Sequence, residues 1–284
     1  ELFETNGAVG LKQSIGIRIH GGYSRAGDLK TISLRPRKNY DIKDYFDYDF
    51  FDGKARSFVN NSKINQFSCI LLRASATDRK HSFFRDAFIQ SLVQTSNTLN
   101  IQSSNPCILY INGEYYGIHN IREIYDKNYI SNYYDMDIED IVIVNNPTGI
   151  AGIEIQEGYA GDEMYYNRMI QYIEKHGARS MENYEFIETI MDIDNFIEYN
   201  ILQIYCDNRD WPGNNVRIWR KRTQDYETNS LYGHDGRWRW LVFDLDYGFG
   251  LFRGESAVQN NSLEMATKVD GPDYPNPPWS TFLL

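Results

Sequence analysis

Residues 107–123, CILYINGEYYGIHNIRE, restrict the possible folds of this chain more than any other segment. Two runs of apolar and aromatic residues flank Asn112-Gly113, and an Asn-Gly pair between such runs is typical of the type I′ turn of a β-hairpin. Further strands are expected at 14–22, 30–37 and 65–75. The first 125 residues are therefore expected to be rich in β-structure.

One helix is expected within this half, at residues 82–97. Ser82 is a suitable N-cap, because its hydroxyl can accept a hydrogen bond from the first turn. One face of this helix would carry Phe84, Ala87, Phe88, Ser91, Leu92 and Thr95. Asp86, on another face, is expected to make an ordinary ion pair on the helix surface.

The pattern becomes helical after residue 125. Helices are expected at 126–134, 161–177, 180–191 and 192–206, and two last strands are expected at 214–221 and 237–245. The polar insertion between these strands, 222–236, is expected to be exposed. The last residues, NPPWSTFLL, have the pattern of a loop that enters another apolar helix, so further sequence is expected beyond residue 284.

This order predicts an α+β protein with two lobes. The N-terminal lobe, 1–125, would be β-rich with one helix. The C-terminal lobe, 126–284, would be mainly helical and would carry the late β-hairpin.

The composition narrows the possible functions. The net charge of −10 argues against a nucleic-acid-binding protein that relies on a broad basic surface. No run of about 18 apolar residues occurs, so no membrane span is expected. The three cysteines form no CxxC pair, and the five histidines show no HxH or HExxH spacing, which argues against a zinc site.

Acid and amide side chains lie at the ends of the late hairpin. Asp210 follows a long helix, and Asn214 and Asn215 open the next strand. Asp244 ends the second strand, and Asp246 would lie on the same face if that strand continued. Such oxygen ligands suit Mg²⁺, which proteins usually hold through one or two carboxylates and substrate phosphate. An Asp, an Asn five residues later and an Asp before a glycine turn also match the phosphoryl-transfer site of protein kinases.

The β-rich half contains residues that could contact a nucleotide. The turn HGGYSRAG, 20–27, could bring backbone N–H groups close to phosphate, and its candidate contacts are Gly21, Gly22, Ser24 and Arg25. Lys30 and Arg35 lie on the next strand and could reach the phosphates. An exposed basic strand face is the alternative reading of these two residues.

The segments 110–130, 208–220 and 238–250 resemble the CotH family, the spore-coat protein H kinases and their bacterial relatives. Segment 17–36 resembles the opening segment of that family, which usually reads RGNSSR…KKSYxLK. The resemblance covers nearly the whole chain. It implies a protein-kinase-like two-lobe fold, binding of ATP with Mg²⁺, and phosphorylation of serine on protein substrates.

The resemblance also implies roles for individual residues. Asp210 matches the catalytic aspartate, Asn215 and Asp244 match the metal side of the site, and Asp246 matches a second acid. Lys30 and Arg35 match positions of the family that face the nucleotide. Arg85 and Glu123 match positions with a structuring or nucleotide-side role. Two departures concern the nucleotide more than the metal. HGGY stands in place of RGNS, and DLKTI stands in place of PKKSY, which leaves one lysine and places the Asp28 carboxylate near the phosphates.

Three functions remain open from the sequence. The first is an active protein serine kinase that uses ATP and Mg²⁺. The second is a catalytically degenerate relative that binds partners in a bacterial envelope or spore coat. The third is a magnesium-dependent phosphotransferase or phosphohydrolase acting on a small molecule. An exported bacterial protein without nucleic-acid partners is expected, with a protein substrate or a coat or envelope protein as its partner.

Overall fold

The computed structural model describes residues 1–146, 153–251 and 253–268. The larger of its two main sheets has five antiparallel strands in the order β3-β4-β7-β9-β8. These strands are β3 (Gly16–His20), β4 (Thr31–Arg35), β7 (Ile70–Arg73), β8 (Ser104–Ile111) and β9 (Glu114–Arg122). The hairpin predicted at 107–123 is confirmed as β8–β9. Asn112 and Gly113 have φ angles of 53° and 82°, as the type I′ turn requires.

The second sheet has four antiparallel strands in the order β11-β10-β12-β13. They are β10 (Ile141–Asn145), β11 (Glu154–Glu157), β12 (Arg217–Lys221) and β13 (Arg239–Trp240). The predicted late hairpin is confirmed as β12–β13, although β13 is much shorter than the strand expected at 237–245. Two small ladders complete the sheets: β1 (Leu2–Phe3) with β2 (Val9–Leu11), and β5 (Phe46–Asp47) with β6 (Gln66–Phe67).

The helices of the second half lie close to their predicted positions. They are α2 (Lys127–Tyr134), α3 (Glu163–His176), α4 (Met181–Glu188) and α5 (Ile193–Tyr205). A further helix, α6 (Ser262–Thr267), was not predicted. Short 3-10 segments are η1 (Tyr23–Ala26), η2 (Ala76–Lys80), η3 (Ile138–Asp140) and η4 (Gly254–Gln259). The side chains of Asp126, Ser180 and Asp192 accept hydrogen bonds from the first turns of α2, α4 and α5, which fixes where these helices begin.

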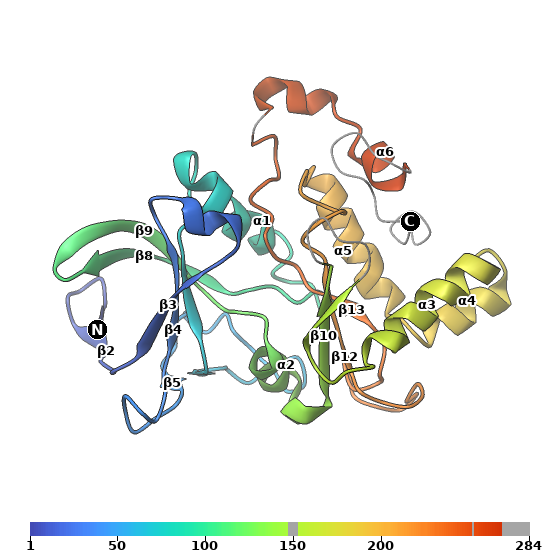
Figure 1. Cartoon of the computed structure of the whole chain (residues 1–284), viewed down its shortest axis with the longest axis horizontal. Coiled ribbons are helices and arrows are strands. Elements are labelled where there is room, and N and C mark those ends of the chain that lie inside the picture. Colours follow the sequence, from blue (N-terminus) through green and yellow to red (C-terminus); the bar gives the residue numbers. More distant parts are fainter. Residues whose placement is uncertain (147–152, 252, 269–284) are drawn as a thin grey trace.

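Two apolar cores lie on the two faces of the second sheet. Successive side chains of a strand point to opposite faces, so Ile218 of β12 joins one core and Trp219 joins the other. The first core packs the sheet against α3, α4 and α5. The second is rich in aromatic rings and combines residues from both sides of residue 125, among them Phe46 and Tyr134. Figure 1 shows the five-stranded sheet at one end of the molecule and α3 and α4 at the other.

The predicted α+β class is confirmed, and the protein-kinase-like two-lobe arrangement stays a prediction. In the part of the chain that the structure describes, no helix is both long and apolar enough to cross a membrane. The C-terminal segment NPPWSTFLL lies outside the described residues.

The helix of the first half differs from its prediction in length and orientation. α1 (Arg85–Ser91) is shorter than 82–97, and Ser82 does not cap it but bonds to Asp78. Its buried residues are Asp86, Ile89 and Gln90, whereas the expected apolar face, with Phe84 and Phe88, is exposed. The expectation that Asp86 lies on the surface is therefore wrong. The physical reason is electrostatic: two arginines of the sheet draw the Asp86 carboxylate inward.

Candidate functional site

Asp244 and Asp246 converge on one guanidinium. Arg73, the last residue of β7, places its Nη2 atom 2.5 Å from Asp244 Oδ1 and 3.2 Å from Asp246 Oδ2. The backbone N–H of Thr77 also donates to Asp246 Oδ2, at 3.1 Å. The two acids were expected to meet because a strand continued through them, and this reason is wrong. The chain has left β13 by this point, and Asp244 has a left-handed φ of 57°.

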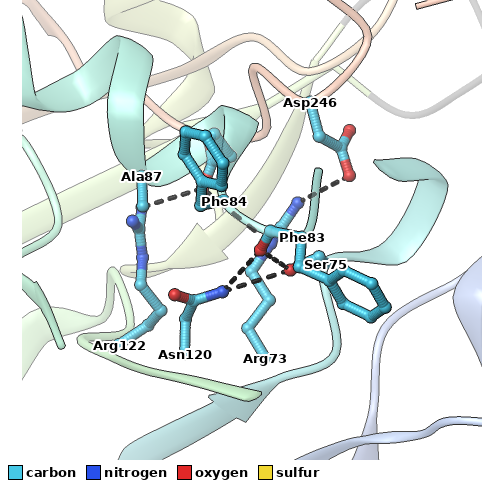
Figure 2. Close-up of a pocket in the computed structure, with 9 residues that line it drawn as sticks. Arg73, Ser75, Phe83, Phe84, Ala87, Asn120, Arg122 and Asp246 are labelled. Atoms are coloured by element: carbon cyan, nitrogen blue, oxygen red, sulfur yellow. Dashed lines mark hydrogen bonds and ion pairs between the residues drawn. The ribbon is translucent and has the colours of Figure 1, made fainter. Parts of the chain in front are cut away.

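A second ion pair, between Arg122 and Asp86, lies beside this group. Arg122 Nη2 lies 2.8 Å from Asp86 Oδ2, and the other Asp86 oxygen accepts a hydrogen bond of 2.9 Å from the N–H of Leu245. Asp86 therefore fixes α1 to both the sheet and the turn between Asp244 and Asp246. Figure 2 shows the Arg73 side chain extending from the sheet toward Asp246, beside a small pocket that the rings of Phe83 and Phe84 also line.

The pKa values of two of these carboxyl groups shift in opposite directions. Burial, followed by the charge of Asp244, raises the pKa of Asp246 to about 7. Burial would also raise the pKa of Asp86, but the charges of Arg122 and Arg73 outweigh it and hold that pKa at about 2. Asp86 thus faces two guanidiniums, whereas Asp246 shares that of Arg73 with Asp244.

The donor set fits Mg²⁺ in part. Asp244 and Asp246 already lie within reach of one cation, the Arg73 guanidinium, so both carboxylates converge on one point. Within the described ranges, no group of three or more His, Cys, Asp or Glu side chains could hold a metal ion. The protein would therefore supply these two carboxylates, and water or phosphate would supply the remaining oxygens, as is usual for Mg²⁺.

Asp210 lies in a different setting, in the loop after α5. Asn214 Nδ2 donates to both of its carboxylate oxygens at 3.1 and 3.2 Å, and Asn215 Nδ2 donates to Oδ2 at 2.7 Å. Asn215, predicted as a metal ligand, therefore uses its amide nitrogen to orient Asp210. Among the described residues, no hydrogen bond joins Asn215 to Asp244 or Asp246.

The glycine-rich turn, 20–27, contains the 3-10 segment η1. Gly21 has a φ of +110°, which favours glycine, and a Cβ atom there would collide with Ser24 Oγ. Gly22 has open space around it. Lys30 donates from Nζ to the carbonyl of Arg25 at 2.7 Å, so its ammonium group ties the turn to the start of β4.

Four arginines surround His20. Burial, followed by nearby positive charges, lowers the pKa of His20 to about 4. These charges belong to Arg35, Arg217, Arg73 and Arg25, in decreasing order of effect. Arg25 and Arg35 were predicted at the site, whereas Arg73 and Arg217 were not.

Arg217 is a half-buried cation close to Asp244. Its Nε atom is buried and has no hydrogen-bond partner in the part of the chain that the structure describes. Its guanidinium lies 4.4 Å from the ring centre of Phe243. Burial lowers its pKa to about 10, with Asp244 among the negative neighbours that oppose this shift. Because Arg217 begins β12 two residues after Asn215, it connects the Asp210 loop with Asp244.

The last two predicted residues lie in structural networks. Arg85 Nη1 donates to the carbonyls of Gly248 and Phe249, both at 3.1 Å, and thus holds the turn after Asp246. Glu123 is buried and accepts hydrogen bonds from Ser103 N and Tyr133 Oη at 2.8 and 2.9 Å. Burial raises its pKa to about 7. A structuring role fits both residues, and a nucleotide-side role for either stays a prediction.

None of the curated proteins compared with this chain matches it. The model of one family, described as CotH kinase protein, matches residues 17–284. The match includes every candidate site residue discussed above and nearly the whole chain. The chain therefore belongs to the CotH kinase protein family.

Proposed function

We propose that the protein is a protein kinase of the CotH type, which uses ATP with Mg²⁺ to phosphorylate serine on a protein substrate. One observation carries this proposal: Asp244 and Asp246 converge beside several guanidiniums, while Asp210 lies in a separate loop where the amides of Asn214 and Asn215 orient it. Phosphoryl transfer needs such a division between groups that bind the charged phosphates and a group that receives the acceptor proton.

The acid pair and the arginines would bind the nucleotide. Asp244 and Asp246 would hold Mg²⁺, which when bound neutralises charge on the phosphates. Arg35 and Arg217 would contact phosphate oxygens, since Arg217 has a buried Nε atom without a hydrogen-bond partner among the described residues. A phosphate group would satisfy that donor and offset the cost of its burial.

Asp210 would act on the acceptor. The amides of Asn214 and Asn215 orient its carboxylate, and a carboxylate held in a fixed direction can receive the proton of an acceptor hydroxyl. The serine oxygen forms a bond to the γ-phosphorus, the bond from that phosphorus to the bridging oxygen breaks, ADP leaves and Asp210 takes the hydroxyl proton.

A second function is favoured by one observation. Arg73 already pairs with both acids, and it could act as a permanent substitute for the metal ion. The protein would then be a degenerate relative that binds a partner without phosphorylating it. Under either function we propose an exported bacterial protein of the cell envelope, surface or spore coat.

The test is calorimetric titration of ATP with and without Mg²⁺. Asp244→Ala should abolish Mg²⁺-dependent binding, because it removes a metal carboxylate. Asp210→Ala should preserve binding but lower phosphate transfer about 10³-fold or more, the loss of several kcal/mol of transition-state stabilisation. Asp225→Ala, at an exposed aspartate in the insertion, is the matched control.

If the folded wild type binds no ATP at millimolar concentration, the kinase proposal fails and the binding-protein function replaces it. If ATP binds equally well without Mg²⁺ and to Asp244→Ala, the assignment of Asp244 to the metal is wrong.

A further inference from the structure

Bulky apolar side chains gather on the surface beside the candidate site. On α1 and at its ends, Phe84, Phe88 and Leu92 follow one another at intervals of four residues and point outward. On α5, Ile197, Ile201 and Tyr205 repeat the same interval. Together with Phe249, these seven side chains are between 39% and 71% exposed. They are called the α1–α5 surface below.

Ring contacts join four of these seven side chains across the two helices. The ring centres of Phe84 and Phe88 are 6.2 Å apart, those of Phe88 and Phe249 are 6.4 Å apart, and those of Phe249 and Tyr205 are 6.1 Å apart. Phe249 therefore bridges the two helices. Figure 1 shows α1 and α5 on either side of the segment that follows Asp246.

The fold holds these side chains outward. Asp86 turns the polar side of α1 inward, which leaves its aromatic side facing solvent. Phe249 has a left-handed φ of 47°, which is unusual for a bulky residue. Its N–H donates to Cys206 O at 2.6 Å, and its carbonyl accepts from Arg85. Exposed apolar patches of this kind, held in place by a rigid framework, are typical of interaction sites.

The surface adjoins both acidic groups of the candidate site. Phe249 lies three residues after Asp246, in the same turn, and Tyr205 lies five residues before Asp210. A polypeptide whose serine reached Asp210 would therefore run next to these rings. An anionic membrane fits less well, because Asp194 and Glu198 are exposed on α5 and the net charge is −10.

We propose that the α1–α5 surface binds the polypeptide that carries the acceptor serine, through aromatic or branched aliphatic side chains close to that serine. This inference rests on the proposed kinase function and adds a side-chain preference to it. The rings of Phe88, Phe249 and Tyr205 are the main contacts, since large aromatic side chains contribute most to such interfaces.

The test uses pooled peptides with a central serine, in which one flanking position at a time is fixed as Phe, Leu, Asn or Thr. Phosphate transfer from ATP with Mg²⁺ and fluorescence anisotropy of labelled peptides are measured on the same pools. Phe88→Ser and Tyr205→Ser are compared with wild type and with Ile42→Ser, a control at another exposed apolar residue. Urea unfolding checks that each variant is folded.

The wild type should prefer Phe or Leu at two or more flanking positions. Phe88→Ser and Tyr205→Ser should each raise the KM or Kd for those peptides about tenfold or more, without changing kcat or the KM for ATP. Ile42→Ser should match the wild type.

Other outcomes separate the two proposals. Selective binding without phosphate transfer would support the docking surface and overturn the kinase function. Transfer without an apolar preference would leave the kinase function and overturn this inference, as would the absence of any peptide binding. A dimer that Phe88→Ser dissociates, with no effect on peptides, would also overturn it and assign the surface to a second copy of the chain.

Discussion

Asp244 and Asp246 are held by an arginine, whereas Asp210, which belongs to the same candidate site, is held by two asparagines. A guanidinium changes the charge balance of a carboxylate, while an amide mainly fixes its direction. The comparison explains why the first group suits a cation and the second suits a proton acceptor. The two groups also differ in how far apart in the chain the residues that hold them lie.

The acid pair depends on distant segments. Arg73, Asp86, Arg122 and the turn at 244–246 come from four parts of the chain and meet only in the folded protein. Asn214 and Asn215, which donate to Asp210, lie within five residues of it. Changes to the first group should therefore affect the stability of the whole fold, and changes to the second should have local effects.

The largest effect on stability is expected from Asp86→Ala. It leaves Arg122 buried without its ion-pair partner and removes the acceptor for Leu245 N, so the free energy of unfolding should fall by about 3–5 kcal/mol. Urea unfolding measures this change, with Asp225→Ala expected to remain within about 0.5 kcal/mol of wild type. A loss below 1 kcal/mol for Asp86→Ala would show that this ion pair does not support the site.

A pH-dependent effect is expected from Asp246. Its pKa in the folded protein, about 7, exceeds the ordinary value of 3.8, so the unfolded chain releases this proton at lower pH. The free energy of unfolding should therefore fall as the pH rises from about 4 to about 7, by at most about 1.4 kcal/mol per pH unit for one group.

Asp246→Asn should remove this part of the pH dependence, as urea unfolding at pH 4.5, 6 and 8 would show. Glu123, also raised to about 7, acts in the same direction and should keep part of the slope. An unchanged slope in Asp246→Asn would contradict the assignment of the raised pKa to this carboxyl.

The smallest effect is expected at Asn215. Asn215→Gly loses the hydrogen bond to Asp210 but keeps the left-handed backbone, so it should cost about 1 kcal/mol. Asn215→Ala should cost about 1 kcal/mol more, because its Cβ disfavours a φ of 57°. Urea unfolding compares the two variants directly, and equal losses would mean that the backbone conformation contributes nothing.

Local patterns predicted much of the fold. The Asn112-Gly113 hairpin and the start of α5 after Asp192 follow from turn and capping preferences of a few residues. The Asp210 group was also found from sequence, since its partners are near in the chain. The buried face of α1 was predicted wrongly. An amphipathic pattern assigns the apolar side of a helix to the core, and it gives no sign of the ion pair that buries Asp86 instead.

Arg73 and Arg217 were missed for a related reason. Each lies on a strand among apolar residues, which resembles an ordinary basic position, and nothing local indicates which acid it will meet. An arginine beside apolar strand residues, such as Arg217 before Ile218, is the one signal that could have drawn attention to them.

By itself, the sequence determined the strands of the five-stranded sheet, the late hairpin with the acidic residues at its ends, most helices and the membership of the CotH family, because each depends on residues close in the chain or on an ordered set of motifs. It did not predict β10 and β11, which complete the second sheet. Only the tertiary structure decided that Arg73 joins Asp244 to Asp246 and that α1 turns its aromatic side outward. These outcomes depend on charges from distant segments, whose interaction energy grows only when folding removes them from water.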